Sequence, residues 1–140
     1  DLEQAVSNAD VVVDACDNFT TRFAINRSCI RQKKVLVSGA AIRMEGQVAV
    51  FDSSDTESPC YQCLYGEGSD EDASCSQNGV MAPVVGIIGA VQAMETIKVI
   101  TGIGSSLCGR LLLLDAATMQ WREMKLPRDK NCGACGPAKS

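Results

Sequence analysis

The chain has 140 residues, of which 46% are hydrophobic, so residues 1–140 are predicted to form a single domain around one core. The net charge is −4 and the 13 basic residues are scattered along the chain, which argues against a nucleic-acid partner. The sequence contains no histidine, which excludes imidazole catalysis and leaves cysteines and carboxylates as candidate zinc ligands.

Apolar patterning predicts an α/β fold. Val11, Val12 and Val13 form a β-branched run that ends in polar residues, which is typical of a buried parallel strand. The sequence predicts a partly parallel, Rossmann-like sheet with a C-terminal antiparallel hairpin, whose last strand has one wetter and one drier face. In chain order, the expected elements are a helix end over 2–9, a strand over 11–13, a helix capped by Thr20 or Thr21, strands over 35–37 and 47–51, a helix over 84–101, and strands over 110–115 and 121–126.

Two segments bear on cellular location. Asp1 to Gln4 has neither the basic start nor the apolar run of a signal peptide, so we expect a cytoplasmic protein with reduced or metal-bound cysteines. The uncharged run from Val80 to Met94 includes Pro83 and is shorter than the roughly 20 residues that a membrane span needs. We therefore expect the central buried helix of a protein that has no membrane partner.

Cys60 and Cys63 form one CxxC pair, and Cys132 and Cys135 form a second. Two such pairs can complete a tetrahedral thiolate site with zinc–sulfur distances of about 2.3 Å. A thioredoxin-like dithiol needs only one pair, at the start of a helix, and independent buried thiols are the other alternative. A closed four-thiolate shell leaves no position for substrate, so the predicted zinc site is structural.

Asp14 and Asp17 follow the first predicted strand, at the carboxyl end where open α/β sheets place ligands. A carboxylate there could hold the magnesium ion of a nucleotide. Asp17, Asn18 and Thr20 are also good helix-capping residues. The residues alone leave both interpretations open.

Cys75 stands outside both pairs, in a polar loop after Glu71 and Asp72. Acidic neighbours raise a thiol's pKa, which disfavours a thiolate nucleophile at this position. An incidental exposed thiol is therefore the plain interpretation of Cys75.

The motifs that carry a family resemblance follow one another along nearly the whole chain: Asp10-Val-Val-Val-Asp-Ala-Cys-Asp17-Asn18 with Arg22, Cys60-Tyr-Gln-Cys63, Gly79-Val-Met-Ala-Pro83-Val-Val-Gly86, Gln92-Ala-Met-Glu95-Thr-Ile-Lys98 and Cys132-Gly-Ala-Cys135. In combination and order they resemble the ThiF and MoeB family, the bacterial relatives of ubiquitin-activating enzymes. The resemblance implies that ATP adenylates the C-terminal glycine of a ubiquitin-like sulfur-carrier protein with a Gly-Gly tail, ahead of molybdopterin or thiamine synthesis. It also implies magnesium, structural zinc and a homodimer.

Position by position, the resemblance assigns Asp17 to the ATP and magnesium site, together with Asn18 and Arg22. It assigns Cys60, Cys63, Cys132 and Cys135 to zinc. Cys75 falls where some members form a covalent link to the carrier and others do not need the thiol. The loop over 64–78 would then cover the carrier's extended tail.

The family's amino-terminal half, with its glycine-rich nucleotide loop, has no counterpart in this sequence. We therefore expect the carboxy-terminal portion of such an enzyme, with negligible adenylation by this chain alone. A noncatalytic, zinc-stabilised module that binds a carrier tail as an added strand is a different possibility. A thiol redox carrier is a third.

Overall fold

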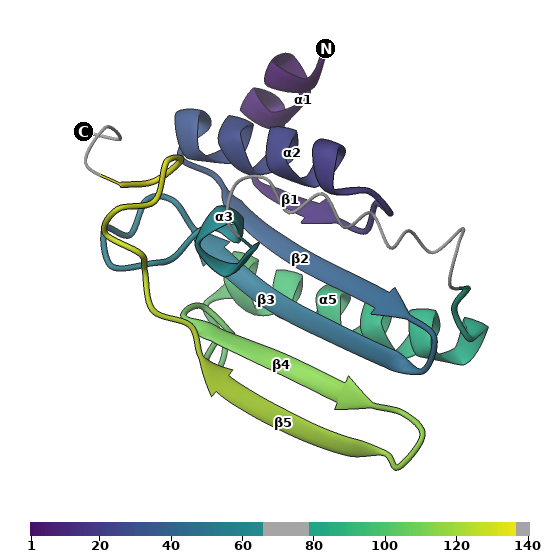
Figure 1. Cartoon of the computed structure of the whole chain (residues 1–140). Coiled ribbons are helices and arrows are strands. Elements are labelled where there is room, and N and C mark those ends of the chain that lie inside the picture. Colours follow the sequence, from purple (N-terminus) through teal and green to yellow (C-terminus); the bar gives the residue numbers. More distant parts are fainter. Residues whose placement is uncertain (66–78, 137–140) are drawn as a thin grey trace.

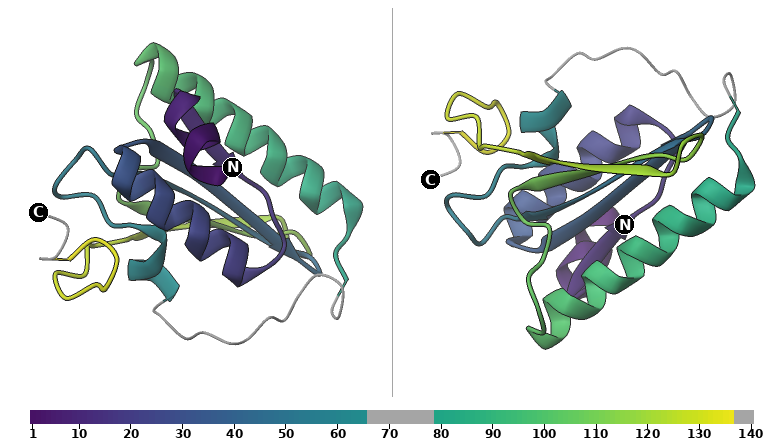
Figure 2. Two further views of the ribbon diagram at one scale, coloured as in Figure 1. Left: turned by 90° about the horizontal axis from the view of Figure 1, so that it is seen from above. Right: turned by 90° about the horizontal axis from the view of Figure 1, so that it is seen from below.

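The computed structural model describes residues 1–65 and 79–136 of the chain. These residues form a layered α/β structure in which α2 and α3 lie on one face of a sheet and α5 lies on the other (Figures 1 and 2). In chain order, the elements are α1 (Leu2–Asn8), β1 (Val11–Asp14), α2 (Phe19–Gln32), β2 (Val35–Ile42), β3 (Glu45–Asp52), α3 (Tyr61–Tyr65), α5 (Ala82–Thr101), β4 (Arg110–Asp115) and β5 (Gln120–Lys125).

The five strands follow one another across the sheet in the order β1-β2-β3-β4-β5. β1 and β2 are parallel, and every later neighbouring pair is antiparallel. The predicted combination of a partly parallel sheet with a C-terminal hairpin is confirmed. The register aligns Gln47 of β3 with Leu113 of β4, and Leu113 with Arg122 of β5, so these three side chains form a row across one face.

Helix α2 begins two or three residues earlier than predicted. Its N-cap is Asn18, whose backbone is extended and whose side-chain oxygen accepts a hydrogen bond from the Thr21 amide at 2.8 Å. The predicted caps, Thr20 and Thr21, are wrong because both residues lie within the first turn. The helix ends at Gln32, and Lys33 follows in the left-handed conformation with φ 54°.

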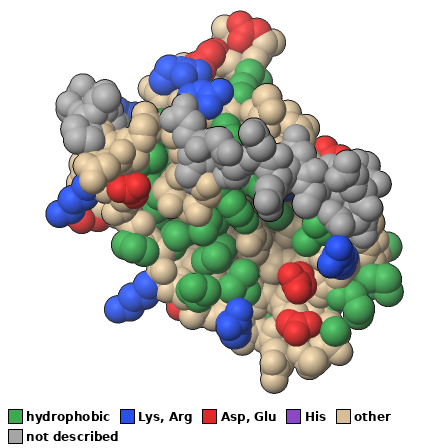
Figure 3. Space-filling view, viewed as in Figure 1, with side chains coloured by type: hydrophobic (Ala, Val, Ile, Leu, Met, Phe, Trp, Pro, Cys, Tyr) green, Lys and Arg blue, Asp and Glu red, His purple; other side chains and the backbone are tan. Residues whose placement is uncertain are grey.

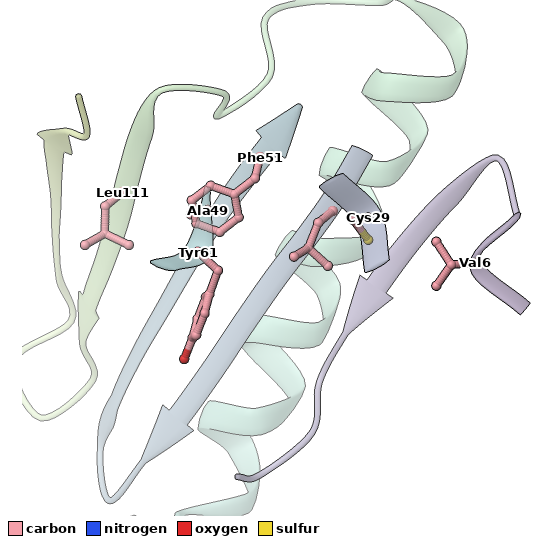
Figure 4. Close-up of a cluster of buried hydrophobic side chains, with 7 residues drawn as sticks. Val6, Cys29, Ala49, Phe51, Tyr61 and Leu111 are labelled. Carbon is pink, nitrogen blue, oxygen red and sulfur yellow. The ribbon is translucent and has the colours of Figure 1, made fainter. Parts of the chain in front are cut away.

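Apolar side chains alternate along β2 and β3 to build a core on each face of the sheet. Figure 4 shows the cluster on the α2 and α3 side, where Leu36, Phe51 and Tyr61 are at most 3% exposed. On the α5 side, Val37 and Val48 pack with a further set of buried residues, which are Val50, Val84, Ile88 and Leu107. The sheet is therefore buried on both faces at its centre.

Helix α5 matches the predicted helix in position, and Gly102 ends it in the left-handed conformation with φ 75°. The prediction that it would be the central buried helix is wrong. Its buried side chains are Val84, Ile88, Gln92 and Glu95. Large apolar side chains between 49% and 64% exposed lie elsewhere on the helix: Val85, Met94, Ile97 and Ile100. The sequence is apolar all round this helix, whereas the sheet covers one side of it.

Helix α5 is long and apolar enough to cross a membrane by length and composition, and it packs along β2 and β3.

Strand β5 differs from its prediction in a similar way. All six of its residues are exposed, including Trp121 and Met124, which point to opposite faces. The expected drier face is absent because α2 and α5 pack over β1, β2 and β3, while β5 lies at the edge of the sheet.

Candidate functional site

A pocket of about 500 Å³ lies on the α2 and α3 side of the sheet. It runs from the loop after β1, across β2 and β3, to the β4–β5 hairpin. Its polar and charged lining residues include Asp17, Asn18, Arg22, Gln47, Asp115 and Arg122. Figure 3 shows hydrophobic side chains gathered over β3, β4 and β5 on this face. The pocket is therefore polar at the end near β1 and again at the β4–β5 hairpin, with apolar side chains between them.

The carboxylates after β1 occupy different environments. Asp14 is 2% exposed, and its Oδ1 accepts a hydrogen bond from the Cys16 amide at 2.9 Å. Asp17 lies three residues further on and lines the pocket. The sequence allowed Asp17 to be either a ligand-binding residue or the cap of α2. The structure shows that the neighbouring Asn18 is the cap. Asp14 thus stabilises the turn, while Asp17 faces the space where a ligand would bind.

Arg22 brings a positive charge to the same end of the pocket. Its side chain is 8% exposed, and one terminal nitrogen, Nη2, donates to the Cys16 carbonyl. The other, Nη1, lies 3.9 Å from Asp14 Oδ2, and neither of these two atoms has a hydrogen-bond partner among the described residues. Buried guanidinium and carboxylate groups normally make close hydrogen bonds. Arg22 is consequently held beside the turn after β1 by its ion pair with Asp14 and its hydrogen bond to the Cys16 carbonyl.

Gln92 of α5 fixes the carboxyl end of β1 from the opposite face of the sheet. Its amide donates to the Asp14 carbonyl at 2.9 Å and lies 3.4 Å from the Val37 carbonyl. The side chain fits there because Gly39 has no Cβ, which would otherwise lie 2.3 Å from Gln92 Cδ. The absence of a side chain at Gly39 therefore allows this close approach.

Aromatic rings form the wall of the pocket on the α2 and α3 side. Tyr61 and Tyr65 have ring centroids 4.9 Å apart, and Tyr65 meets Phe19 edge-on at 5.3 Å. Gln47 donates a hydrogen bond to the Tyr65 hydroxyl, and burial raises the pKa of Tyr65. These groups are therefore neutral side chains that orient one another and shape an apolar channel.

Four thiols meet at the other end of α3. Cys60 Sγ lies 3.9 Å from Cys63 Sγ and 3.7 Å from Cys132 Sγ, and Cys63 Sγ lies 3.4 Å from Cys135 Sγ. All four sulfur atoms lie within 4.8 Å of one another. Tetrahedral zinc with bonds of about 2.3 Å separates its sulfur ligands by roughly 3.8 Å. The predicted ligand set is brought together in an arrangement that fits this ion.

Backbone amides also point at these sulfur atoms. The amides of Cys60 and Asp129 each lie 3.4 Å from Cys63 Sγ. The hydrogen bond between the Cys60 and Cys63 thiols lowers the pKa of Cys63 and raises that of Cys60, whose burial adds to the increase. The cluster therefore favours a thiolate at Cys63 even before a metal binds.

Cysteines outside the cluster lie in different surroundings. Burial raises the pKa of Cys29 to about 12, and burial with the neighbouring Asp14 raises that of Cys16 to about 11. These thiols are neutral at physiological pH, as expected for core and turn residues. Cys75 lies outside the described residues.

Sequence reasoning missed the pocket residues outside the β1–α2 turn, namely Gln47, Tyr61, Tyr65 and Arg122. The i, i+4 spacing of the two tyrosines around Cys63 was the one available signal that both face the same side. The row of Gln47, Leu113 and Arg122 follows from strand register, which the sequence does not specify.

Comparison with known proteins gives matches over nearly the whole chain. Residues 1–134 match the ThiF family model. The molybdopterin-synthase adenylyltransferase of Escherichia coli (strain K12) is 46% identical over 136 residues, which are 97% of this chain and 54% of that protein. The adenylyltransferase and sulfurtransferase MOCS3 of Aedes aegypti is 42% identical over 135 residues, and the match covers 94% of this chain and 30% of that protein.

Solved structures give the same fold. The crystal structure of E. coli MccB has a TM-score of 0.77 at 16% identity, and the match covers 98% of this chain and 42% of MccB. MccB solved with ATP has a TM-score of 0.75 at 17% identity, with 96% and 43% covered. The chain therefore spans about half the length or less of these relatives. The family model and the curated relatives together establish that the chain belongs to the ThiF family.

Proposed function

We propose that this chain takes part in the ATP-dependent adenylation of the C-terminal glycine of a ubiquitin-like sulfur-carrier protein. The observation that carries the proposal is the pocket that joins the charged turn after β1 to an apolar channel across the sheet. Relatives that match almost the whole chain are named adenylyltransferases, and a structural neighbour was solved with ATP. The names of the relatives favour the molybdopterin route over the thiamine route.

In this proposal the polar end of the pocket receives the nucleotide. Asp17 would hold magnesium, which would neutralise negative charge on phosphate oxygens. Arg22 would supply a fixed positive charge at this end of the pocket, and Asn18 keeps the turn in place by capping α2. Stabilising charge that develops during the transfer is the main contribution that such groups make.

The apolar channel would receive the carrier's tail. A Gly-Gly tail has no side chains to accommodate, so it can lie close to a sheet surface. Ala40 and Ala41 are small lining residues near the charged end, and Tyr61, Tyr65 and Leu113 line the channel. This arrangement supports an extended tail that points its terminal carboxylate toward Arg22.

We propose that zinc binds Cys60, Cys63, Cys132 and Cys135. A closed thiolate shell supplies a cross-link and no reactive position, so its role would be structural. We also propose a homodimer in the cytoplasm, and the exposed apolar side of α5 supports burial against another protein surface.

Cys75 remains a candidate for a covalent link to the carrier. We predict that Cys75→Ser leaves the zinc content unchanged while abolishing any covalent carrier adduct, which mass spectrometry of the intact protein would detect. Loss of zinc in this variant would contradict the ligand assignment.

A noncatalytic module that binds a carrier tail as an added strand is the second candidate function. It is favoured by β5, which lies at the edge of the sheet and is exposed along its whole length. Carrier binding that does not depend on ATP would support this alternative.

Titration calorimetry with ATP in the presence and absence of magnesium tests the main proposal. Magnesium-dependent binding should weaken by about tenfold or more in Asp17→Asn, because a neutral amide replaces the anionic ligand. Asp10→Asn is the matched control, since Asp10 is exposed at the opposite end of β1. Equal binding by both variants would contradict the assignment of Asp17.

We predict that these 140 residues alone show negligible carrier-dependent ATP–pyrophosphate exchange. Among the described residues that line the pocket, Arg22 and Arg122 are the cations, and the transfer of a nucleotidyl group relies on several positioned positive charges. Exchange at the level of a longer relative would contradict this prediction.

A further inference from the structure

Asn26 lies in the middle of α2 and is 1% exposed, so its side-chain amide is shielded from water. Its Oδ1 accepts a hydrogen bond from the Tyr61 amide at 3.0 Å, and its Nδ2 donates to Cys60 Sγ at 3.5 Å. The orientation of the amide is determined by chemistry, because a backbone N–H can only donate. Both halves of the side chain are therefore used, and both contact the segment that begins the cysteine cluster.

Asn26 also stands one helical turn after Arg22, so the two side chains share a face of α2. Arg22 lines the pocket, and so does Tyr61, which directly follows Cys60. The Tyr61 ring contacts Phe23 of α2 edge-on, with ring centroids 5.4 Å apart. Helix α2 and Tyr61, which directly follows the proposed metal ligand Cys60, thus connect the cysteine cluster to the charged end of the pocket.

We infer that Asn26 is a positioning residue that couples occupancy of the four-thiol site to the placement of α2, and through α2 to Arg22 at the pocket. A metal at the cluster fixes Cys60, and the two hydrogen bonds of Asn26 transmit that position to the helix. The inference rests on the proposed metal, and it assigns the cluster a role in shaping the pocket beyond holding the chain together. Groups that hydrogen-bond metal ligands from outside the coordination shell commonly change metal affinity by 10–100-fold.

The two variants of Asn26 separate its two contacts. Asn26→Asp keeps an acceptor for the Tyr61 amide and replaces the N–H that faces Cys60 with an oxygen. Asn26→Ala removes both contacts and leaves a small space. Ser53→Ala is the matched control, because the Ser53 hydroxyl joins the end of α2 to the start of β2 through the carbonyls of Cys29 and Lys34 without touching a cysteine sulfur.

The first measurement is the rate of zinc transfer from the loaded, full chain to a chromogenic chelator. Transfer should be about tenfold faster or more in both Asn26 variants, and within about twofold of wild type in Ser53→Ala. If wild type binds no zinc when zinc is supplied, the proposed metal site is overturned and this inference with it. If wild type binds zinc and the Asn26 variants release it at the wild-type rate, this inference alone is overturned.

The second measurement separates coupling from a merely structural role. Backbone hydrogen exchange is compared with and without zinc over residues 19–26 of α2 and over α5 as a reference. In wild type, zinc should slow exchange in 19–26 more than in α5, and in Asn26→Ala this extra protection should disappear. Exchange that is faster in Asn26→Ala by the same factor with and without zinc would overturn the inference. If neither variant folds, the wild-type protein still tests the inference. The inference is overturned if zinc does not slow hydrogen exchange in residues 19–26 more than in α5.

Discussion

The cysteine cluster and the pocket lie at opposite ends of the contact between α2 and α3, and they are built in opposite ways. The cluster takes its four thiols from two short pairs, is mostly buried, and is closed once a metal binds. The pocket takes its lining from the turn after β1, from β2 to β5 and from α3, and is open to a ligand. A closed metal site contributes mainly stability and an open pocket receives a ligand, so variants at the two places should differ in whether they also lose zinc.

The largest expected effect is loss of the metal. Cys135 is 1% exposed, and Cys135→Ser would remove one of four thiolate ligands. Zinc should fall well below one equivalent, and the free energy of unfolding should drop by about 4 kcal/mol or more, as is found when a structural metal is lost.

Metal analysis and thermal unfolding measure both results for Cys135→Ser. Cys108→Ser is the control, since Cys108 is half-buried and lies outside the cluster. Full zinc content in Cys135→Ser would contradict the assignment of Cys135 as a metal ligand. Tightly held zinc that resists mild oxidation in wild type would also exclude a reversible dithiol carrier.

A smaller effect is expected at the wall of the pocket. Tyr65→Phe keeps the ring contacts with Tyr61 and Phe19 and removes the hydroxyl that accepts a hydrogen bond from Gln47. The free energy of unfolding should fall by about 1 kcal/mol, and denaturant titration would measure it. Zinc content should stay at the wild-type level. A loss of zinc would show that the pocket and the cluster are not separable at this residue.

The smallest effect is expected at α1, away from both sites. Hydrogen bonds from Arg31 and Gln32 hold the pKa of Glu3 at about 2, below the ordinary value of 4.5. The unfolded chain therefore binds more protons than the folded chain between these values. The contribution of Glu3 to stability is complete above about pH 4.5 and is lost as the pH falls toward 2.

Unfolding of Glu3→Gln and of wild type, compared at each pH, measures this contribution. The difference in stability should be constant above pH 4.5 and shrink below it. Equal zinc content at neutral pH is expected in both proteins. A difference that does not depend on pH would contradict the assignment to the Glu3 carboxylate.

The sequence predicted what depends on near neighbours. Cys60 with Cys63 and Cys132 with Cys135 are recognisable because each pair fits one metal from a single turn. The position of Asp17 followed from the strand that precedes it, and the helix over 84–101 followed from its uncharged apolar run. Strand β1 and the β4–β5 hairpin were likewise predicted from short apolar runs.

What depends on packing between distant segments was not predictable from the sequence. Gln47 and Arg122 reach the pocket through strand register, which is decided by pairing across the whole sheet. The exposure of Ile97 and Ile100 was missed because periodicity identifies an apolar surface but does not say how much of it the sheet covers. Asn18 was one of the capping residues that the sequence offered, but the choice of Asn18 over Asp17 and Thr20 depends on the backbone conformation, which composition does not reveal.

The spacing of the two cysteine pairs also has a topological consequence. Cys60 and Cys132 are 72 positions apart, and a metal bound to both closes the chain into a ring that contains α5 and the β4–β5 hairpin. Closing a long ring restricts the unfolded chain most, so the metal acts on the denatured ensemble as well as on the folded one. A single backbone cut within this ring would leave two fragments that the bound metal still joins.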